Sequence, residues 1–200
     1  VEIYRQRAVS AGPNLIRLAD GNEISAANIL SASGAWPSIP GIPGAEYGIT
    51  SNEVFHLENL PKRAVIAGAG YIANEFAGIF NELGVEVTLV TRGDKMLRSY
   101  DQEIVEKLVG ISREKGIDIR FNFKCPAIRK QADGSLLVES GTGEDVETDL
   151  VLFAIGRVPK TMDLGLETVG IALDKDGAVI VDDYNRTNVA GIYAVGDVTN

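Results

Sequence analysis

The stretch RAVIAGAGYIANEFAGIFNELGVEVTLVTRGDKMLR, residues 63–98, decides the fold of this 200-residue chain. Its apolar residues 64–67 predict a short strand, and the apolar run 85–90 predicts a second one. Between them, apolar residues recur with helical spacing and predict one buried helix face, made of Ile72, Phe76, Phe80 and Leu83. Strand, helix and strand in this order indicate a β-α-β unit.

A glycine-rich turn joins the first strand to the helix. Gly68 and Gly70, followed by Ala73, give the pattern G-x-G-x-x-A. Gly68 permits a tight turn where a Cβ would clash, Gly70 lets the backbone approach a pyrophosphate, and Ala73 keeps the helix close to the sheet. The helix start offers unpaired N–H groups and a positive dipole end, which suit an anion. The turn therefore predicts a dinucleotide site, with a plain strand-to-helix turn as the alternative.

The end of the second strand predicts which dinucleotide binds. NAD-binding proteins usually have Asp or Glu there to accept hydrogen bonds from the ribose 2′-OH. This chain has Thr91 instead, with Arg92 next and Arg98 six residues later. Guanidinium groups suit a 2′-phosphate, so the residues favour NADP(H). The alternative is that both arginines are solvated surface residues.

Composition excludes several classes of protein. The net charge of −9 argues against a nucleic-acid or anionic-membrane partner, and no apolar run is long enough to cross a membrane. No metal site is predicted, and the single Cys125 cannot form an internal disulfide. The chain starts at Val1 within a predicted strand, so we expect it to be part of a longer protein. No targeting signal is visible, which favours a cytoplasmic location.

The rest of the chain predicts an α/β fold with flanking β segments. Residues 1–43 read as strands that end in a proline-rich connector. After the β-α-β unit, Ser99 and Gln102 predict a capping box for a second helix, whose apolar face would contain Ile104, Val105, Leu108 and Val109. Residues 117–121 predict a third strand, and 124–149 predict an antiparallel meander with a hairpin at Asp133. Residues 150–155 predict a central buried strand, and the tail predicts two more strands, 178–181 and 192–195.

Three predicted strands have small side chains near their carboxyl ends and are followed there by a glycine. These glycines are Gly34, Gly156 and Gly196. Ligands of open α/β sheets lie outside the carboxyl ends of the strands, and glycine there lets the backbone approach them. The repetition predicts more than one nucleotide contact, although glycines also simply end strands.

Taken together, the motifs resemble the flavin disulfide reductases of the pyridine nucleotide-disulfide oxidoreductase family. The resembling segments, in the order of that family, are Ser33–Pro37, Gly68–Gly78, Thr91–Asp101, Ala154–Pro159 and Gly191–Asp197. The paired arginines look like those of the NADPH-using glutathione reductases rather than the NAD-using lipoamide dehydrogenases. The resemblance implies a Rossmann-like NADP(H)-binding domain, residues 44–160, flanked by two pieces of an FAD-binding domain, 1–43 and 161–200.

The resemblance also implies roles for matching residues. Tyr71 would cover the nicotinamide site and Glu75 would lie near it. The other NADP(H)-binding residues would be Gly68, Gly70, Ile72, Arg92, Arg98 and Gly156. On the FAD side, Asp197 would contact the ribityl or pyrophosphate region, with Gly34 and Gly196 nearby.

Several departures from the family pattern limit what this chain would do. Gly93 stands where many relatives have a polar or basic residue, which predicts a somewhat weaker hold on the 2′-phosphate. The chain has neither a first flavin-type glycine motif nor a C-x-x-x-x-C pair, and its only histidine, His56, does not match the catalytic histidine of the family. Cys125 is interpreted as a passive thiol. No catalytic residue is therefore expected in the chain, which alone should lack turnover.

The sequence accordingly predicts the NADPH-binding portion of a flavin-dependent disulfide reductase. Glutathione disulfide is the expected small-molecule substrate, and the full-length protein is expected to be a homodimer. The alternatives are a reductase with another acceptor (trypanothione, mercuric ion, thioredoxin or lipoamide) or a non-catalytic nucleotide-binding module.

Overall fold

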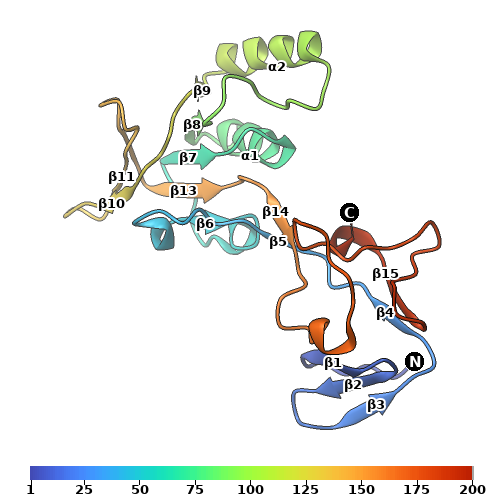
Figure 1. Ribbon diagram of the computed structural model, residues 1–200. Helices are drawn as coiled ribbons and strands as arrows, with labels where there is room; N and C mark the ends of the chain where they lie inside the picture. The colour runs from blue at the N-terminus through green and yellow to red at the C-terminus, as the bar shows by residue number, and fades with distance from the viewer. Residues whose placement is uncertain (200) are drawn as a thin grey trace. The chain divides into compact units, whose positions relative to one another are not determined.

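The computed structural model describes residues 1–199, which divide into two compact units (Figure 1). Unit 1 comprises Val1–Trp36 and the segment from Arg157 onward, whereas unit 2 is the continuous segment Pro37–Gly156. Unit 2 begins seven residues before residue 44, where the sequence predicted that the NADP(H)-binding domain starts, because the proline-rich segment packs within this unit. There Pro43 accepts a hydrogen bond from the Ile128 N–H at 2.9 Å.

Unit 2 contains a five-stranded parallel sheet and both α-helices of the described chain. The order of its strands is β6 (Ile49–Thr50), β13 (Leu150–Phe153), β7 (Arg63–Ala67), β8 (Glu86–Val90) and β9 (Asp118–Arg120). The helices are α1 (Tyr71–Glu82) and α2 (Gln102–Glu114), and two short 3₁₀ helices are η1 (Ala45–Tyr47) and η2 (Val54–His56). β13 lies inside the sheet and is buried along its whole length, as predicted.

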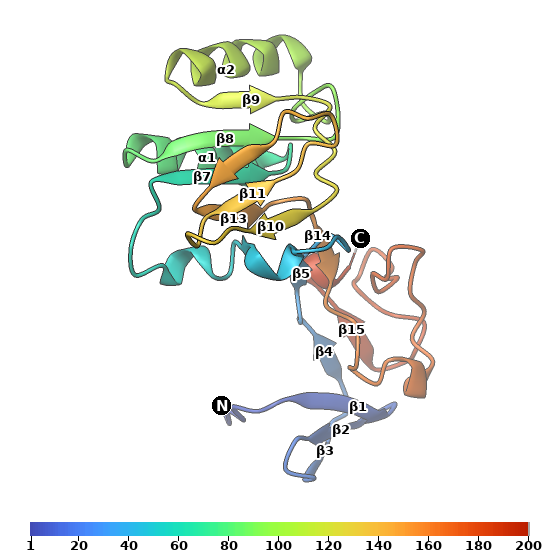
Figure 2. The same ribbon diagram turned by 90° about the vertical axis from the view of Figure 1, so that its left-hand side faces the viewer.

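The central strands pack against a different layer on each face. In β7, Ala64 and Ile66 join the core formed with the helices, whereas Val65 and Ala67 join a second core on the opposite face. This alternation follows from the two-residue period of a strand. The second core contains side chains of a meander. Figure 2 shows the strands of this meander over the sheet. Unit 2 therefore has three layers: helices, parallel sheet and meander.

The predicted meander is confirmed. It consists of β10 (Ile128–Lys130), β11 (Leu136–Val138) and β12 (Val146–Thr148), paired antiparallel in this order. Asp133 closes the turn between β10 and β11. Its carboxylate accepts one hydrogen bond from the Ser135 N–H at 3.0 Å and another from the Ser135 hydroxyl at 2.7 Å. These bonds lower the pKa of Asp133.

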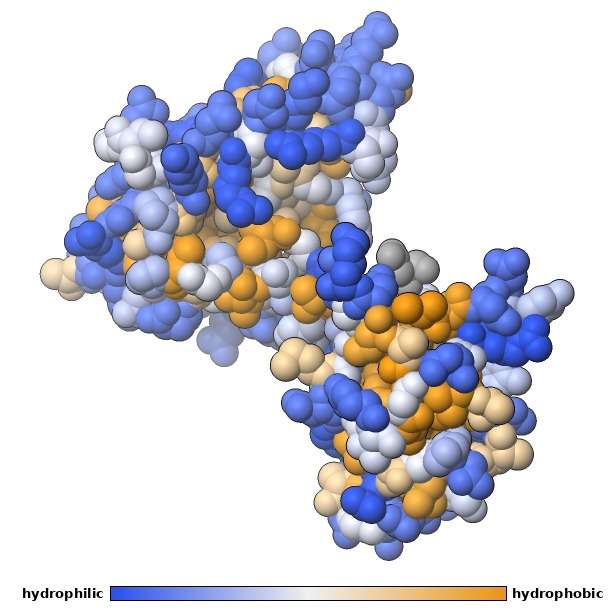
Figure 3. All heavy atoms as spheres, in the orientation of Figure 1, coloured by the Kyte–Doolittle hydropathy of each residue, from blue (hydrophilic) through white to orange (hydrophobic). Residues whose placement is uncertain are grey.

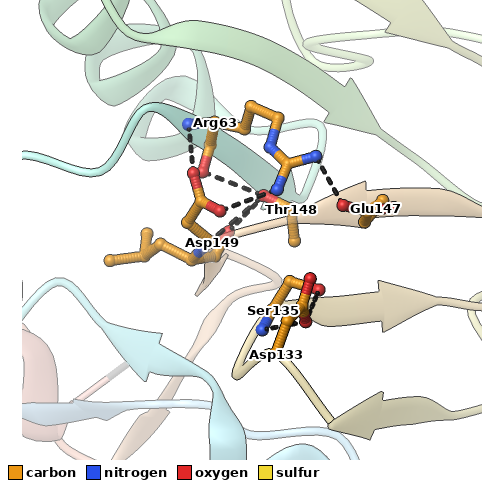
Figure 4. A network of polar contacts seen from close by, with 7 residues as sticks. Arg63, Asp133, Ser135, Glu147, Thr148 and Asp149 are labelled. Atoms are coloured by element: carbon orange, nitrogen blue, oxygen red, sulfur yellow. Dashed lines mark hydrogen bonds and ion pairs between the residues drawn. The ribbon is translucent and has the colours of Figure 1, made fainter. Parts of the chain in front are cut away.

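One polar network ties the meander to the start of β7 (Figure 4). The Arg63 guanidinium donates to Asp149 and to Glu147, each at 2.8 Å, and the Arg63 N–H donates to Asp149 at 2.9 Å. The Thr148 hydroxyl donates to the Arg63 carbonyl at 3.0 Å. The network fixes the register at which β12 leads into β13.

Unit 1 is built from small sheets. They are the antiparallel sheet of β1 (Ala8–Gly12), β2 (Leu15–Leu18) and β3 (Glu23–Ser25), the parallel pair β4 (Ile29–Ser31) and β15 (Ile192–Ala194), and the pair β5 (Ala35–Pro37) and β14 (Arg157–Pro159). The last residue of β5, Pro37, is already the first residue of unit 2. Two 3₁₀ helices, η3 (Glu167–Val169) and η4 (Gly196–Val198), complete it. Its core contains few buried side chains: Leu166, Ile171, Val179, Ile192, Ala194 and Val198. Apolar atoms remain visible over the β4–β15 region in Figure 3, and Leu30 is 59% exposed.

Some local expectations were wrong. Residues 1–7 form no strand, and 178–181 make only isolated bridges at Val179. The cap of α2 is Asp101 rather than Ser99, because its carboxylate accepts from the N–H groups of Glu103 and Ile104 at 3.0 and 3.3 Å.

The buried helix faces are also narrower than predicted. Leu83 follows the end of α1 and is 57% exposed. In α2 only Val105 is buried, while Ile104 is 70% exposed, because neighbouring helical positions point about 100° apart. No helix in the described part of the chain is long and apolar enough to span a bilayer.

Candidate dinucleotide site

The turn after β7 requires glycine at its first position. Gly68 has φ 154°, and a Cβ built on it would lie 2.2 Å from the Ala154 carbonyl oxygen. Its N–H donates to the Val90 carbonyl at 2.9 Å, so the turn is held between the ends of β13 and β8. The clash inferred from the sequence is thus a backbone clash with the neighbouring strand.

Gly70 is the N-cap of α1, and in contrast to Gly68 it has open space where a side chain would be. A Cβ on Gly70 would meet no atom within 4 Å. No side chain caps the helix, and its first turn contains no acidic residue. Ala73, on the inner side of that turn, is fully buried. The uncapped N–H groups and the open space beside Gly70 fit a bound phosphate group.

A groove of about 760 Å³ opens at the carboxyl ends of the strands of unit 2. Its lining residues are Ser38–Ile42, Ala67–Ala69, Val90–Gly93, Arg98, Phe123–Cys125, Phe153 and Ile155. Among these described residues the charged ones are Arg92, Arg98 and Lys124, and none is acidic. The volume is in the range of a cofactor site, and the charge suits a phosphate-bearing ligand.

The two arginines lie on the loop after β8. Arg92 and Arg98 both line the groove and are exposed. Arg98 lies 3.6 Å from the Asp94 carboxylate, and its Nη2 lies 2.2 Å from where a Cβ of Gly93 would be. The absence of a side chain at Gly93 therefore makes room for the Arg98 guanidinium. Thr91 is buried and its hydroxyl accepts from the Gly93 N–H at 3.3 Å.

Gly70 and four other residues predicted for this site are not among the lining residues of the groove. Tyr71 starts α1 and is 54% exposed, and Glu75 is exposed one turn further along the same helix face. Ile72 is partly buried against the helix-side core. Gly156 follows the lining residue Ile155, and its carbonyl accepts from the Ser38 N–H at 2.9 Å.

The residues predicted for a second nucleotide all lie in unit 1. β4 and β15 are parallel neighbours, so Gly34 and Gly196 follow strands that end at the same edge. Both glycines adopt the left-handed backbone conformation, with φ angles of 72° for Gly34 and 75° for Gly196. Asp197 is the second residue of η4, the short helix after β15, and its carboxylate lies 3.7 Å from the Arg157 Nε.

Sequence reasoning missed two segments of the groove, 38–42 and 123–125. The signal for the second was available, because Lys124 follows the carboxyl end of β9, where ligands of α/β sheets bind. Cys125 also lines the groove, and its burial raises the pKa of the thiol. A raised pKa disfavours the thiolate, which agrees with the passive role expected for this cysteine.

Turn, helix start and cationic groove together define a dinucleotide-binding α/β protein. The family model described as pyridine nucleotide-disulphide oxidoreductase matches residues 1–200. The chain therefore belongs to the pyridine nucleotide-disulphide oxidoreductase family, which confirms both the resemblance and the α/β, Rossmann-like fold class inferred from the sequence.

Individual relatives agree with this assignment. The chain is 48% identical over 200 residues to a glutathione reductase of Burkholderia cepacia, covering all of this chain and 44% of that protein. It is 47% identical over 175 residues to a trypanothione reductase of Leishmania donovani, covering 86% of this chain and 35% of that protein. Among solved structures, the HOCl-induced flavoprotein disulfide reductase RclA from Escherichia coli matches with a TM-score of 0.94 and 31% identity, over 99% of this chain and 46% of that one. The chain thus spans less than half the length of these relatives.

Proposed function

We propose that this chain is the NADPH-binding portion of a flavin-dependent disulfide reductase that acts on glutathione disulfide. In such an enzyme the nicotinamide supplies a hydride to the flavin, whose electrons then reduce a disulfide. The 200 residues contain a single cysteine, so they lack the cysteine pair of that chemistry. Their own part in the reaction would be to bind and orient the two nucleotides.

The groove of unit 2 is the observation that carries this proposal. It combines Gly68 of the glycine turn with two arginines and contains no acidic lining residue, in a chain whose net charge is −9. A 2′-phosphate would meet Arg92 and Arg98, whereas the carboxylate that usually binds a free ribose 2′-OH is missing. NADPH should therefore bind in preference to NADH.

The remaining roles follow from the positions of the residues. The pyrophosphate would lie at the start of α1, beside Gly68, Gly70 and Ile72. Tyr71 and Glu75, exposed on one face of α1, would lie by the nicotinamide together with Gly156. In unit 1, the shared edge at Gly34 and Gly196 is proposed to contact FAD, with Asp197 directed to its ribityl or pyrophosphate region.

Glutathione disulfide is the proposed acceptor because a bacterial glutathione reductase matches the chain along its whole length. Trypanothione reductases match at 44–47% identity over less of the chain, which makes trypanothione disulfide the second candidate. Assembly of the full-length protein as a homodimer is part of the same proposal. The cytoplasmic location stays a prediction from the sequence.

Direct titration tests the cofactor assignment. Calorimetric titration of NADPH and of NADH into the chain should give at least about a tenfold tighter Kd for NADPH, because a charge-assisted bond to the 2′-phosphate contributes about 1.5–3 kcal/mol. Arg98→Met should remove most of that preference without weakening NADH. The exposed Arg5→Met, in unit 1, is the matched control and should keep it. Equal or tighter binding of NADH by the unaltered chain would refute the proposal.

A further inference from the structure

We propose that Lys124 is a third cation for the 2′-phosphate and a specificity-determining residue of this groove. The proposal rests on the NADPH-binding function proposed above and names a residue that neither the glycine turn nor the loop after β8 contains. It is argued from the course of the chain between β9 and β10, from the charges in the groove, and from the space at Gly93.

The segment before Lys124 is joined by its backbone to the arginine loop. The Phe123 N–H donates to the Thr91 carbonyl at 2.9 Å, and the Asn122 N–H donates to the Gly93 carbonyl at 3.0 Å. These bonds continue the pairing of β8 with β9 beyond the ends of both strands. Lys124 consequently lies directly beside the loop that contains the two arginines, and it lines the same groove.

The backbone around Lys124 adopts an unfavourable conformation. Asn122 and Cys125, on either side of it, have φ 57° and 48°. Asn tolerates the left-handed region, but a non-glycine residue such as Cys125 is uncommon there and strained. Phe123 is buried and Cys125 half-buried, so the segment is anchored on both sides while Lys124 stays exposed. Such strain persists where the surrounding structure fixes it, as it does in binding loops.

The charge of Lys124 is uncompensated. Within the described part of the chain its ammonium forms no ion pair, whereas Arg98 is already 3.6 Å from Asp94. The loop has no further cation in the groove lining, because Gly93 has no side chain, the Arg98 guanidinium fills the space beside it, and Lys95 does not line the groove. A doubly charged phosphate between Arg92 and Arg98 would therefore find its third positive charge on the neighbouring segment.

The test compares NADPH and NADH binding by calorimetry in the unaltered chain and three variants. Lys124→Met should weaken NADPH about fivefold to tenfold, less than a buried ion pair would, and leave NADH within about twofold. Lys124→Arg should restore the preference. Lys95→Met is the matched control: Lys95 is an exposed lysine of the same loop that does not line the groove, and its loss should leave the ratio of the two Kd values unchanged.

Each remaining outcome has a definite meaning. An unchanged NADPH Kd in Lys124→Met, an equal loss for both cofactors, or an equal effect of Lys95→Met would overturn the role of Lys124. If Arg98→Met abolishes the preference while Lys124→Met does not, the NADPH function stands and Lys124 alone is refuted. If the unaltered chain shows no preference for NADPH, the proposed function itself fails.

Discussion

The two units of this chain differ in how completely they bury their own residues. Unit 2 is one continuous segment with two cores, one on each face of a five-stranded sheet. Unit 1 is assembled from two segments, and its strands form three small sheets over one small core. Because stability grows with buried apolar area, unit 2 should be the more stable of the two. The groove therefore lies in the unit that we expect to be the more stable one.

Two spectroscopic signals separate the units and give the largest expected effect. The single tryptophan, Trp36, belongs to unit 1, whereas α1 and α2 belong to unit 2. In a urea titration the Trp36 fluorescence should therefore change at a clearly lower urea concentration than the far-ultraviolet circular dichroism of the helices. Coincident transitions would mean one cooperative unit and would break the comparison.

Glycine-to-alanine changes sharpen the comparison at three sites. Gly68→Ala should destabilise unit 2 by about 2–3 kcal/mol, because its Cβ would meet the Ala154 backbone. Gly34→Ala in unit 1 meets no atom and should cost only about 1 kcal/mol, from the left-handed φ of 72°. The helical transition in urea reports the first change, and Trp36 fluorescence reports the second.

Gly70→Ala completes this series as a control for binding. Its Cβ would point into open space, so the helical transition should shift by less than about 1 kcal/mol. NADPH binding should nevertheless weaken, because the side chain would occupy the space proposed for the pyrophosphate. A Gly70→Ala variant that binds NADPH normally would contradict that placement.

The smallest effect is a pH dependence confined to unit 2. Hydrogen bonds from Arg63 lower the pKa of Asp149, so this carboxylate stabilises the fold above its unfolded pKa of about 3.9. That contribution is lost as the pH falls through the lower, folded pKa. Asp149→Asn should lower the midpoint of the helical transition at pH 7 and flatten its decline below pH 4.

The exposed Glu106→Gln, on α2, is the control for this charge change and should shift neither quantity. The Trp36 transition should stay the same in both variants, since the Arg63 network lies in unit 2. A decline in acid that Asp149→Asn leaves unaltered would show that other carboxylates determine it.

Local patterns predicted four of the five strands in the parallel sheet of unit 2, the glycine turn and the meander, because each rests on spacing within about ten residues. The two-residue edge strand β6 (Ile49–Thr50) was not predicted. Features that depend on distant packing were not predictable. The narrow buried face of α2 depends on where the helix meets the sheet, so Ile104 and Leu108 were misjudged. The groove wall at 38–42 and 123–125 likewise forms only when separate segments come together. The cap at Asp101 was missed because Ser99 offered an equally regular motif.

The position of β13 also bears on how the chain acquires its structure during synthesis. β13 lies between β6 and β7 in the sheet, yet it follows both strands in the sequence. Leu152 pairs with Ile49, 103 residues earlier, on one side and with Ile66, 86 residues earlier, on the other. On the ribosome, β7, β8 and β9 can associate early, while β6 must wait until residue 153 has emerged. β13 is thus the last strand of unit 2 to be synthesised, and it joins β6 to the sheet of β7, β8 and β9. The groove, which Phe153 lines, is complete only when β13 has inserted.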